Sequence, residues 1–351
     1  MQRSFSITSP LMSGNLNLKK PTVILATLTF IFLSAVTGVL IDVYLYAEKP
    51  ANTDPLEKIV IITPGQGFQA LTKQLYKAGI IEQPMKFEWF ARLKGYDKRI
   101  KSGEYLLSFS MSPRKILEVI VSGKVRLHRI TIPEGYHLRQ IARALAEAGF
   151  GTENDFLKAA TDPILVNDYG IDAKTFEGYL FPDTYLFPKG ATPEMVVSAM
   201  VKRFWSVMKP EWEDRAGALG FSIHQVITLA SIIEKETGAA HERPLISSVF
   251  HNRLKRKMRL ESDPTVIYGI KDYDGNIKRK HLAEHTPYNT YQINGLPPGP
   301  ISNTGIESIK AALYPADTRF LYFVSKGDNT HQFSTNVKDH YRAVRKYQLG
   351  R

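Results

Sequence analysis

Residues 21–41 contain no charged side chain: their sequence is PTVILATLTFIFLSAVTGVLI. A helix needs about 20 apolar residues to cross a bilayer, and this stretch is longer than the apolar region of a signal peptide. No small-x-small cleavage site follows it directly. We therefore predict a transmembrane helix over residues 21–43. Lysines precede the stretch and acids follow it, so the positive-inside rule predicts a cytoplasmic N-terminus over residues 1–20, with the remaining chain outside the membrane.

The composition bounds the number of domains and the chemistry. The chain has 351 residues, of which 43% are apolar, and this is enough for two or three small domains. A net charge of +12 suits nucleic acid or another acidic polymer, but an excess of Lys and Arg on a solvated face explains it equally well. The sequence has no cysteine, which excludes disulfides, zinc–thiolate sites and cysteine nucleophiles.

A polar linker, predicted over residues 44–57, precedes two related strand–turn–helix units. The first has a strand at 59–62 and a helix at 68–78, and the second has a strand at 130–132 and a helix at 138–148. Apolar residues recur at matching positions of the two helices, Phe68, Leu71 and Leu75 in the first and Leu138, Ile141 and Leu145 in the second. This shared spacing predicts an internal duplication, and chance similarity of two short pieces is the alternative.

Apolar spacing and Pro or Gly boundaries predict the remaining elements. Helices are expected at 84–94, 113–121, 193–208, 243–254 and 306–313, a strand or hairpin at 100–109, and a strand at 320–324. Between them, residues 177–185 (EGYLFPDTY) interleave aromatic rings with Asp183. These rings could line a sugar cleft, because ring faces pack on pyranose C–H surfaces, or they could form a tight connection between packed segments.

The apolar run from Val226 to Ile233 predicts a helix, and it ends in two acids, Glu234 and Glu236. An acid at the end of a buried helix is costly to desolvate, so it should be either paired or functional. Glycoside cleavage needs such a carboxyl, with a pKa raised enough to hold a proton near neutrality. The two acids point to nearly opposite sides, and the helical wheel does not decide between them. A solvated surface acid is the alternative for either.

Two polar motifs follow this helix. Asp263 and Thr265 flank Pro264, which disfavours helix at the preceding residue, so we predict that their side chains lie on a turn. There they could cap the next helix or reach a substrate. The loop at 288–292 (YNTYQ) is crowded with donors and aromatic rings and is followed by GLPPGP. Loops of this composition are candidates for holding N-acetyl sugars.

The long motifs ER-(x)4-SVFHNRL-(x)5-RLESDPTVIYG, PYNTYQINGLPPGPISNTG and LYFVSKGDNTHQFS stand in this order. With the pair Glu236–Thr237 at the end of the apolar helix, they resemble the endolytic peptidoglycan transglycosylase family, the membrane-bound lytic transglycosylases of type G. The resemblance covers nearly the whole chain. It implies an α+β fold: the transmembrane helix, LysM-like α/β modules over residues 58–222, and a mixed α+β catalytic domain over residues 223–351 with a lysozyme-like catalytic helix.

The resemblance also implies a chemistry. Glu236 would protonate the oxygen between N-acetylmuramic acid and N-acetylglucosamine, and as a base it would then help the muramic C6 hydroxyl to close on C1. The product is a 1,6-anhydro end, and the biological role is the termination of nascent glycan strands. The candidate substrate contacts are Asp263, Thr265, Tyr288, Asn289, Tyr291, Gln292 and His331.

The same resemblance implies no cofactor and no metal. The expected partners are peptidoglycan strands and the membrane, with peptidoglycan synthases as candidates and no nucleic acid. The expected location is the inner membrane, with a single span and a periplasmic catalytic region. His281 and His285 have helical spacing, but Thr286-Pro287 follow at once and no third metal ligand is obvious, so we interpret them as surface residues.

Two other classes of function stay open from the residues. One is a non-catalytic, membrane-anchored scaffold that binds peptidoglycan through the LysM-like units. The other is a basic protein that binds nucleic acid or anionic lipid, with steeply salt-dependent affinity. The residues do not decide between cleavage within strands and cleavage at their ends.

Overall fold

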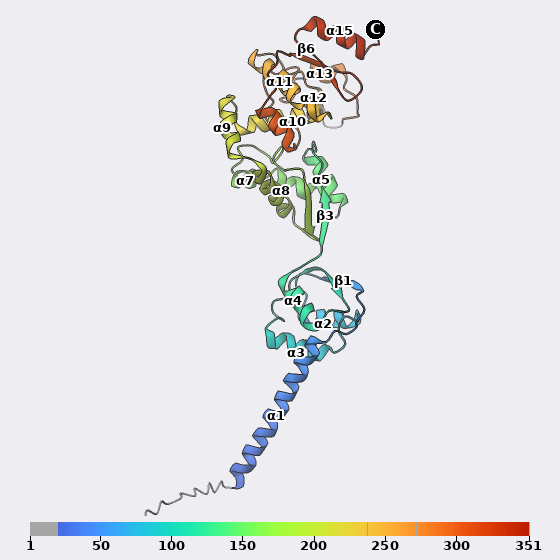
Figure 1. The fold of residues 1–351 in the computed structure, drawn as a ribbon, viewed down its shortest axis with the longest axis vertical. Coiled ribbons are helices and arrows are strands. Elements are labelled where there is room, and N and C mark those ends of the chain that lie inside the picture. The colour runs from blue at the N-terminus through green and yellow to red at the C-terminus, as the bar shows by residue number, and fades with distance from the viewer. Residues whose placement is uncertain (1–19, 237, 271–272, 351) are drawn as a thin grey trace, which may run out of the picture. The chain divides into compact units, whose positions relative to one another are not determined.

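The computed structural model describes residues 20–236, 238–270 and 273–350, and its fold is mixed α+β (Figure 1). The chain divides into two compact units, unit 1 over Met1–Arg126 and unit 2 over Leu127–Arg351. The boundary that the sequence predicts at residue 222 therefore lies inside unit 2. The second strand–helix piece shares a compact unit with the segment predicted to be catalytic.

Unit 1 begins with α1 (Lys20–Glu48), the single helix of the described residues that is long and apolar enough by itself to cross a membrane (Figure 1). The predicted span ends at residue 43, but the helix continues to Glu48, because residues 44–49 contain no Gly or Pro that would end it. The first part of the predicted linker is therefore helical. Val43 and Ala47 are buried and belong to the core of unit 1.

The rest of unit 1 packs around one antiparallel strand pair. Its elements are β1 (Glu57–Ile62), α2 (Phe68–Lys77), α3 (Pro84–Lys94), β2 (Gly103–Ser108) and α4 (Pro113–Ser122). β1 pairs with β2, with Val60 opposite Tyr105. The apolar faces of the helices cover this pair, and the residues predicted from helical spacing, Leu71 and Leu75, are fully buried. The predicted strand or hairpin at 100–109 is a single strand.

Unit 2 also starts with a strand, a turn and a helix. Its first half contains β3 (Leu127–Thr131), α5 (Leu138–Glu147), α6 (Glu153–Ala160), α7 (Pro163–Asp168), β4 (Thr184–Pro188), α8 (Pro193–Val207) and α9 (Pro210–Ala218). β3 pairs antiparallel with β4, as β1 does with β2. Both predicted strand–helix pieces are thus present, and in each the strand pairs with a strand that follows later in the chain.

The second half of unit 2 surrounds one buried helix. Its elements are α10 (Ile223–Glu236), η1 (Ala240–Glu242), α11 (Arg243–Lys255), α12 (Asp263–Gly269), α13 (Arg279–Ala283), α14 (Ile306–Leu313), β5 (Tyr322–Ser325), β6 (His331–Ser334) and α15 (Val337–Tyr347). α10 packs against α11, α12 and α14, and every side chain from Val226 to Ile233 is buried. β5 begins two residues later than predicted, and it is only partly buried.

Candidate active site

The two acids that end α10 have different surroundings. The carboxylate of Glu234 lies 3.3 Å from the Arg243 guanidinium and accepts a hydrogen bond from the backbone N–H of Gly305 at 3.2 Å. Glu234 is therefore held by an ion pair and a backbone donor. Glu236 has a different partner, because its carboxylate accepts a hydrogen bond from the Ser262 hydroxyl. These contacts distinguish the two acids, which the helical wheel alone does not.

Burial is the main reason why the pKa of Glu236 rises from 4.5 to about 7. The charge of Asp263 raises this pKa further, while the hydrogen bond from Ser262 and the charge of Arg253 lower it. A carboxyl with such a pKa can both donate a proton and take it back near neutral pH. Thr237, which the resemblance pairs with Glu236, lies outside the described residues.

Two threonines hold Ser262 in place. The backbone N–H of Ser262 donates to the Thr290 hydroxyl at 2.9 Å, and the Thr265 hydroxyl donates to the Ser262 carbonyl at 2.7 Å. The two threonine hydroxyls lie 2.8 Å apart, and both side chains are buried. Thr265, a predicted substrate contact, thus has no exposed surface in this arrangement. It positions the serine that contacts Glu236.

Asp263 and Tyr291 lie beside the carboxyl of Glu236. The prediction that Asp263 sits on a turn is wrong, because Asp263 is the first residue of α12. Pro264 is tolerated there since the N–H groups of the first helical turn have no partner within the helix. The Tyr291 hydroxyl donates to the Asp263 carboxylate at 2.7 Å. The charge of Asp263 raises the pKa of Glu236, and the charges of Asp263 and Glu236 both raise the pKa of Tyr291.

The amide side chains of the 288–292 loop donate hydrogen bonds to backbone carbonyls of the protein itself. Asn289 is buried, and its amide donates to the carbonyls of His281 and Glu284 at 3.0 and 2.6 Å. The Gln292 amide donates to the Leu282 carbonyl at 2.6 Å. These bonds tie the loop to α13 and fix its shape. Both amides therefore support the loop that carries Tyr291.

Tyr288 and His331 have other neighbours. The Tyr288 ring packs against the ring of Tyr268, with their centroids 4.8 Å apart. His331 Nδ1 lies 2.7 Å from the Glu242 carboxylate, and both side chains are largely buried. This pair joins η1 to the start of β6. No direct contact joins His331 to Glu236 among the hydrogen bonds and ion pairs of the described residues.

Glu177 is a buried acid that the sequence analysis missed. Its carboxylate accepts hydrogen bonds from the backbone N–H of Leu138, the Asn303 amide and the Tyr268 hydroxyl, each at 3.1 Å. Burial raises its pKa to about 7, although these donors act in the opposite direction. The available signal was an acid that directly precedes the largely apolar stretch 178–182.

A cavity of about 760 Å³ opens in unit 2 between α5 and α12. Its lining includes the basic or titratable side chains of His137, Arg139, Arg143 and Lys235. It also includes Glu177 and Tyr268, which share the hydrogen bond described above. Lys235 and Pro264 also line it, and they are the sequence neighbours of Glu236 and Asp263. The cavity therefore lies next to the elements that carry the acid, and three cationic side chains, Arg139, Arg143 and Lys235, lie among its largely apolar lining.

The described residues contain no group of three or more His, Asp or Glu side chains that could hold a metal ion. The arrangement offers one half-buried acid with a raised pKa, one hydroxyl bonded to it, and one acid–tyrosine pair beside it.

Comparison with known proteins gives consistent matches. Residues 60–346 match the model of the YceG-like family. The chain is 32% identical over 324 residues to the endolytic murein transglycosylase of Bacillus subtilis, covering 87% of this chain and 89% of that protein. It is 30% identical over 319 residues to the protein of the same name from Streptococcus pneumoniae, where it spans 57% of the longer relative.

A solved structure agrees with this match. The crystal structure of a YceG-like protein from Listeria monocytogenes has a TM-score of 0.58 and 32% sequence identity to this chain, and the match covers 82% of this chain and 98% of the other. The family match extends from β1 to α15 and so includes Glu236 and every candidate substrate contact. The chain belongs to the YceG-like family.

Proposed function

We propose that this protein is an endolytic murein transglycosylase, a lyase that cuts peptidoglycan glycan strands. The observation that carries the proposal is the Glu236 carboxyl, half-buried at the end of α10, with a pKa of about 7 and a serine hydroxyl bonded to it. The names of the B. subtilis and S. pneumoniae relatives support the same activity. The proposed biological role is the termination of nascent strands during cell-wall synthesis.

In the proposed reaction, Glu236 donates its proton to the oxygen between N-acetylmuramic acid and N-acetylglucosamine, and that bond to the muramic C1 breaks. The muramic C6 hydroxyl attacks C1, and the Glu236 carboxylate takes the hydroxyl proton. The atoms balance without water, and the new end is a 1,6-anhydro sugar. Ser262 holds one carboxylate oxygen, so it orients the acid. The Asp263 carboxylate, held by Tyr291, faces the positive charge that develops at C1.

Asp263 also gives a second candidate reaction. Glycosidases that use water need two carboxylates, and Asp263 is close enough to raise the pKa of Glu236. Hydrolysis would leave a reducing end in place of the anhydro ring. The chemical nature of the new end therefore distinguishes the two reactions.

We propose that the cavity beside α12 receives the acidic peptide stem of the muramic acid. Peptidoglycan stems carry carboxylates, and the cavity lining includes three cationic side chains, Arg139, Arg143 and Lys235. An arginine can bind a carboxylate through two parallel hydrogen bonds. The cavity lies next to Glu236 along the chain, so a stem held there would keep its sugar close to the acid.

We also propose a single-pass membrane anchor, with α1 in the inner membrane and both units in the periplasm. In unit 1 the order β1–α2–α3–β2, with an antiparallel strand pair, supports a LysM-like, glycan-binding module. Peptidoglycan synthases remain proposed partners. The alternative function, a non-catalytic membrane-anchored scaffold, would bind glycan strands without cutting them.

The test compares Glu236→Gln with Glu234→Gln in the full-length chain, using the release of soluble fragments from purified peptidoglycan. We expect Glu236→Gln to abolish release while the melting temperature stays at or above that of the wild type. Glu234→Gln should keep measurable activity but melt at a lower temperature, because it weakens the pair with Arg243. The assignment fails if Glu234→Gln abolishes cleavage and Glu236→Gln does not.

A further inference from the structure

Helix α3 carries an apolar stripe on its exposed surface. Met85, Trp89 and Leu93 are 65%, 42% and 50% exposed, and their spacing of four residues places them on one face of the helix. Other residues of the same helix, Phe87, Phe90 and Ala91, are fully buried in the core of unit 1. A surface helix normally presents polar residues opposite its buried face. Helix α3 instead has apolar residues on both its buried face and its exposed face.

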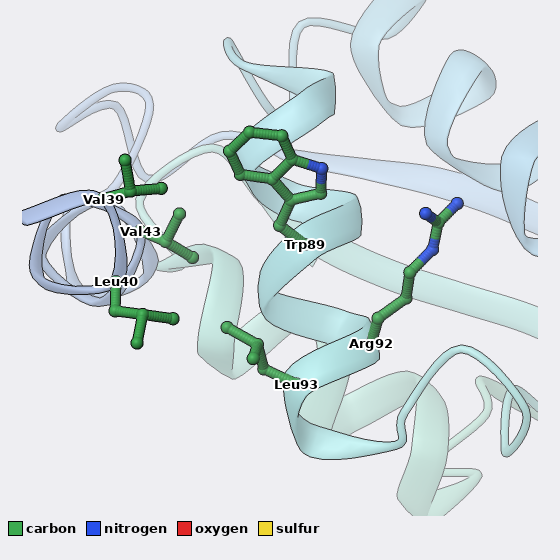
Figure 2. Close-up of a pocket in the computed structure, with 6 residues that line it drawn as sticks. All are labelled: Val39, Leu40, Val43, Trp89, Arg92 and Leu93. Atoms are coloured by element: carbon green, nitrogen blue, oxygen red, sulfur yellow. The ribbon is translucent and has the colours of Figure 1, made fainter. Parts of the chain in front are cut away.

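The stripe borders a groove of about 350 Å³ between α3 and the end of α1. Its lining consists of Val39, Leu40 and Val43 from α1 and Trp89, Arg92 and Leu93 from α3. Figure 2 shows the α1 side chains on one side and the α3 side chains on the other, with the Arg92 guanidinium on the side away from α1. The groove is thus apolar along its length, with one cationic group at its edge.

The groove lies where α1 would leave a bilayer. Asp42 is the first charged residue after the apolar stretch, so Val39 and Leu40 belong to the last apolar turn. A hydrocarbon layer about 30 Å thick takes about 20 helical residues, which is the whole stretch back to Pro21. Val39 and Leu40 then lie at the level where acyl chains meet head groups. Tryptophan prefers this level, and Trp89 is beside them.

Basic side chains lie around the stripe. The Lys86 ammonium is 2.6 Å from the Asp42 carboxylate, and the Lys94 ammonium lies over the Tyr44 ring at 5.1 Å from its centroid. Arg92 contacts Glu88 at 3.2 Å in an exposed pair on the helix, which is a weak interaction. Arginine and lysine next to exposed apolar residues are typical of helices that lie on anionic membranes.

From the stripe, the groove and these charges, we infer that α3 lies in the head-group layer of the membrane that α1 spans. The groove holds an acyl chain of an anionic glycerophospholipid, and Arg92 contacts its phosphate. This inference rests on the proposed membrane span of α1 but not on the proposed catalysis. It makes unit 1 a module that lies on the bilayer surface, with a second attachment besides the span.

Bromine-labelled lipid tests the position of α3. The full-length chain is placed in nanodiscs of phosphatidylcholine and phosphatidylglycerol, with and without bromine at shallow acyl positions, and its tryptophan emission is compared. The chain has three tryptophans. We expect brominated lipid to quench part of the wild-type emission. The matched variant Trp89→Phe keeps Trp205 and Trp212 and should lose this quenching.

Equal quenching of the wild type and Trp89→Phe, or no quenching of either, would overturn the inference. In that case water or another protein, and not lipid, would cover the groove. A chain recovered outside the nanodiscs would overturn the membrane span itself, while the peptidoglycan cleavage assay would still report on the proposed function. The two failures are therefore distinguishable.

Native mass spectrometry of the chain released from mixed-lipid nanodiscs tests the bound lipid. We expect retained phosphatidylglycerol to exceed retained phosphatidylcholine for the wild type, and the excess to fall at least twofold in Arg92→Gln. Arg99→Gln is the control, because Arg99 is exposed in the loop after α3 and does not line the groove. Equal retention of both lipids, or the same loss in Arg99→Gln, would contradict the proposed lipid contact.

Discussion

Replacing Ser262 with alanine should move the pH dependence of cleavage without removing the acid. The Ser262 hydroxyl donates to the Glu236 carboxylate and lowers its pKa against the larger effect of burial. Without this donor the ionised carboxylate is less stable, so the pKa rises. In the proposed reaction Glu236 is a general acid that works only while protonated, so the descending limb of the rate profile should move to higher pH in Ser262→Ala.

The size of the shift follows from the hydrogen bond. A hydrogen bond to a charged group contributes about 1.5–3 kcal/mol, and one pKa unit corresponds to about 1.4 kcal/mol. The limb should therefore move by about 1–2 units from its wild-type position, which the pKa of Glu236 sets at about 7. The maximal rate should also fall, because the carboxyl loses the group that orients it.

The assay is the rate of soluble fragment release from peptidoglycan over the neutral and alkaline range, with the full-length chain in detergent. Ser247→Ala is the matched control, since that serine is buried in α11 and its hydroxyl has no hydrogen-bond partner among the described residues. Its limb should stay at the wild-type position. An unmoved limb in Ser262→Ala, or a shift to lower pH, would refute the assignment of Glu236 as the acid.

Three further predictions concern stability and substrate binding. Glu236→Gln should be more stable than the wild type by about 1–3 kcal/mol at pH 8, and the difference should vanish near pH 4. The reason is that a carboxyl whose pKa is raised from 4.5 to about 7 in the folded state destabilises the fold as the pH rises through this window. Melting curves at pH 4 and pH 8 check this prediction. Arg243→Met should cost about 3–5 kcal/mol in urea unfolding, because it leaves the Glu234 carboxylate without its buried partner, whereas an exposed pair would cost under about 1 kcal/mol. Arg139→Gln combined with Arg143→Gln should raise KM several-fold for strands that carry peptide stems but not for strands stripped of them, and an equal rise for both would contradict a stem-binding cavity.

Local sequence patterns predicted most elements well. Helical spacing located α2 and α5 with ends within one residue of the structure, and it located α10 although that helix begins three residues before the apolar run, because apolar periodicity directly reflects burial. The turn predicted at Asp263 was wrong, since proline is compatible with the first turn of a helix. The linker predicted over residues 44–57 began too early, because residues 44–48 contain no helix breaker and Ala47 packs in the core of unit 1.

The site itself depends on contacts that no local pattern reports. The helical wheel did not decide between Glu234 and Glu236, and only the family resemblance selected Glu236; in the structure, the Gly305 backbone and Ser262, which lie far along the chain, distinguish the two acids. The role of Glu177 likewise depends on Leu138 and on residues more than ninety positions away. Asp263 and Tyr291 were among the candidates because polar and aromatic residues were present, but their hydrogen bond was not predictable.

The most direct measurement of the central claim is the mass of the new glycan ends that the purified full-length chain produces from peptidoglycan. If Glu236 both gives a proton to the leaving oxygen and takes one from the C6 hydroxyl, each muramic end is an anhydro sugar, one water lighter than a reducing end. The same ends should be absent after treatment with Glu236→Gln. Reducing ends from the wild type, or anhydro ends from Glu236→Gln, would contradict the account.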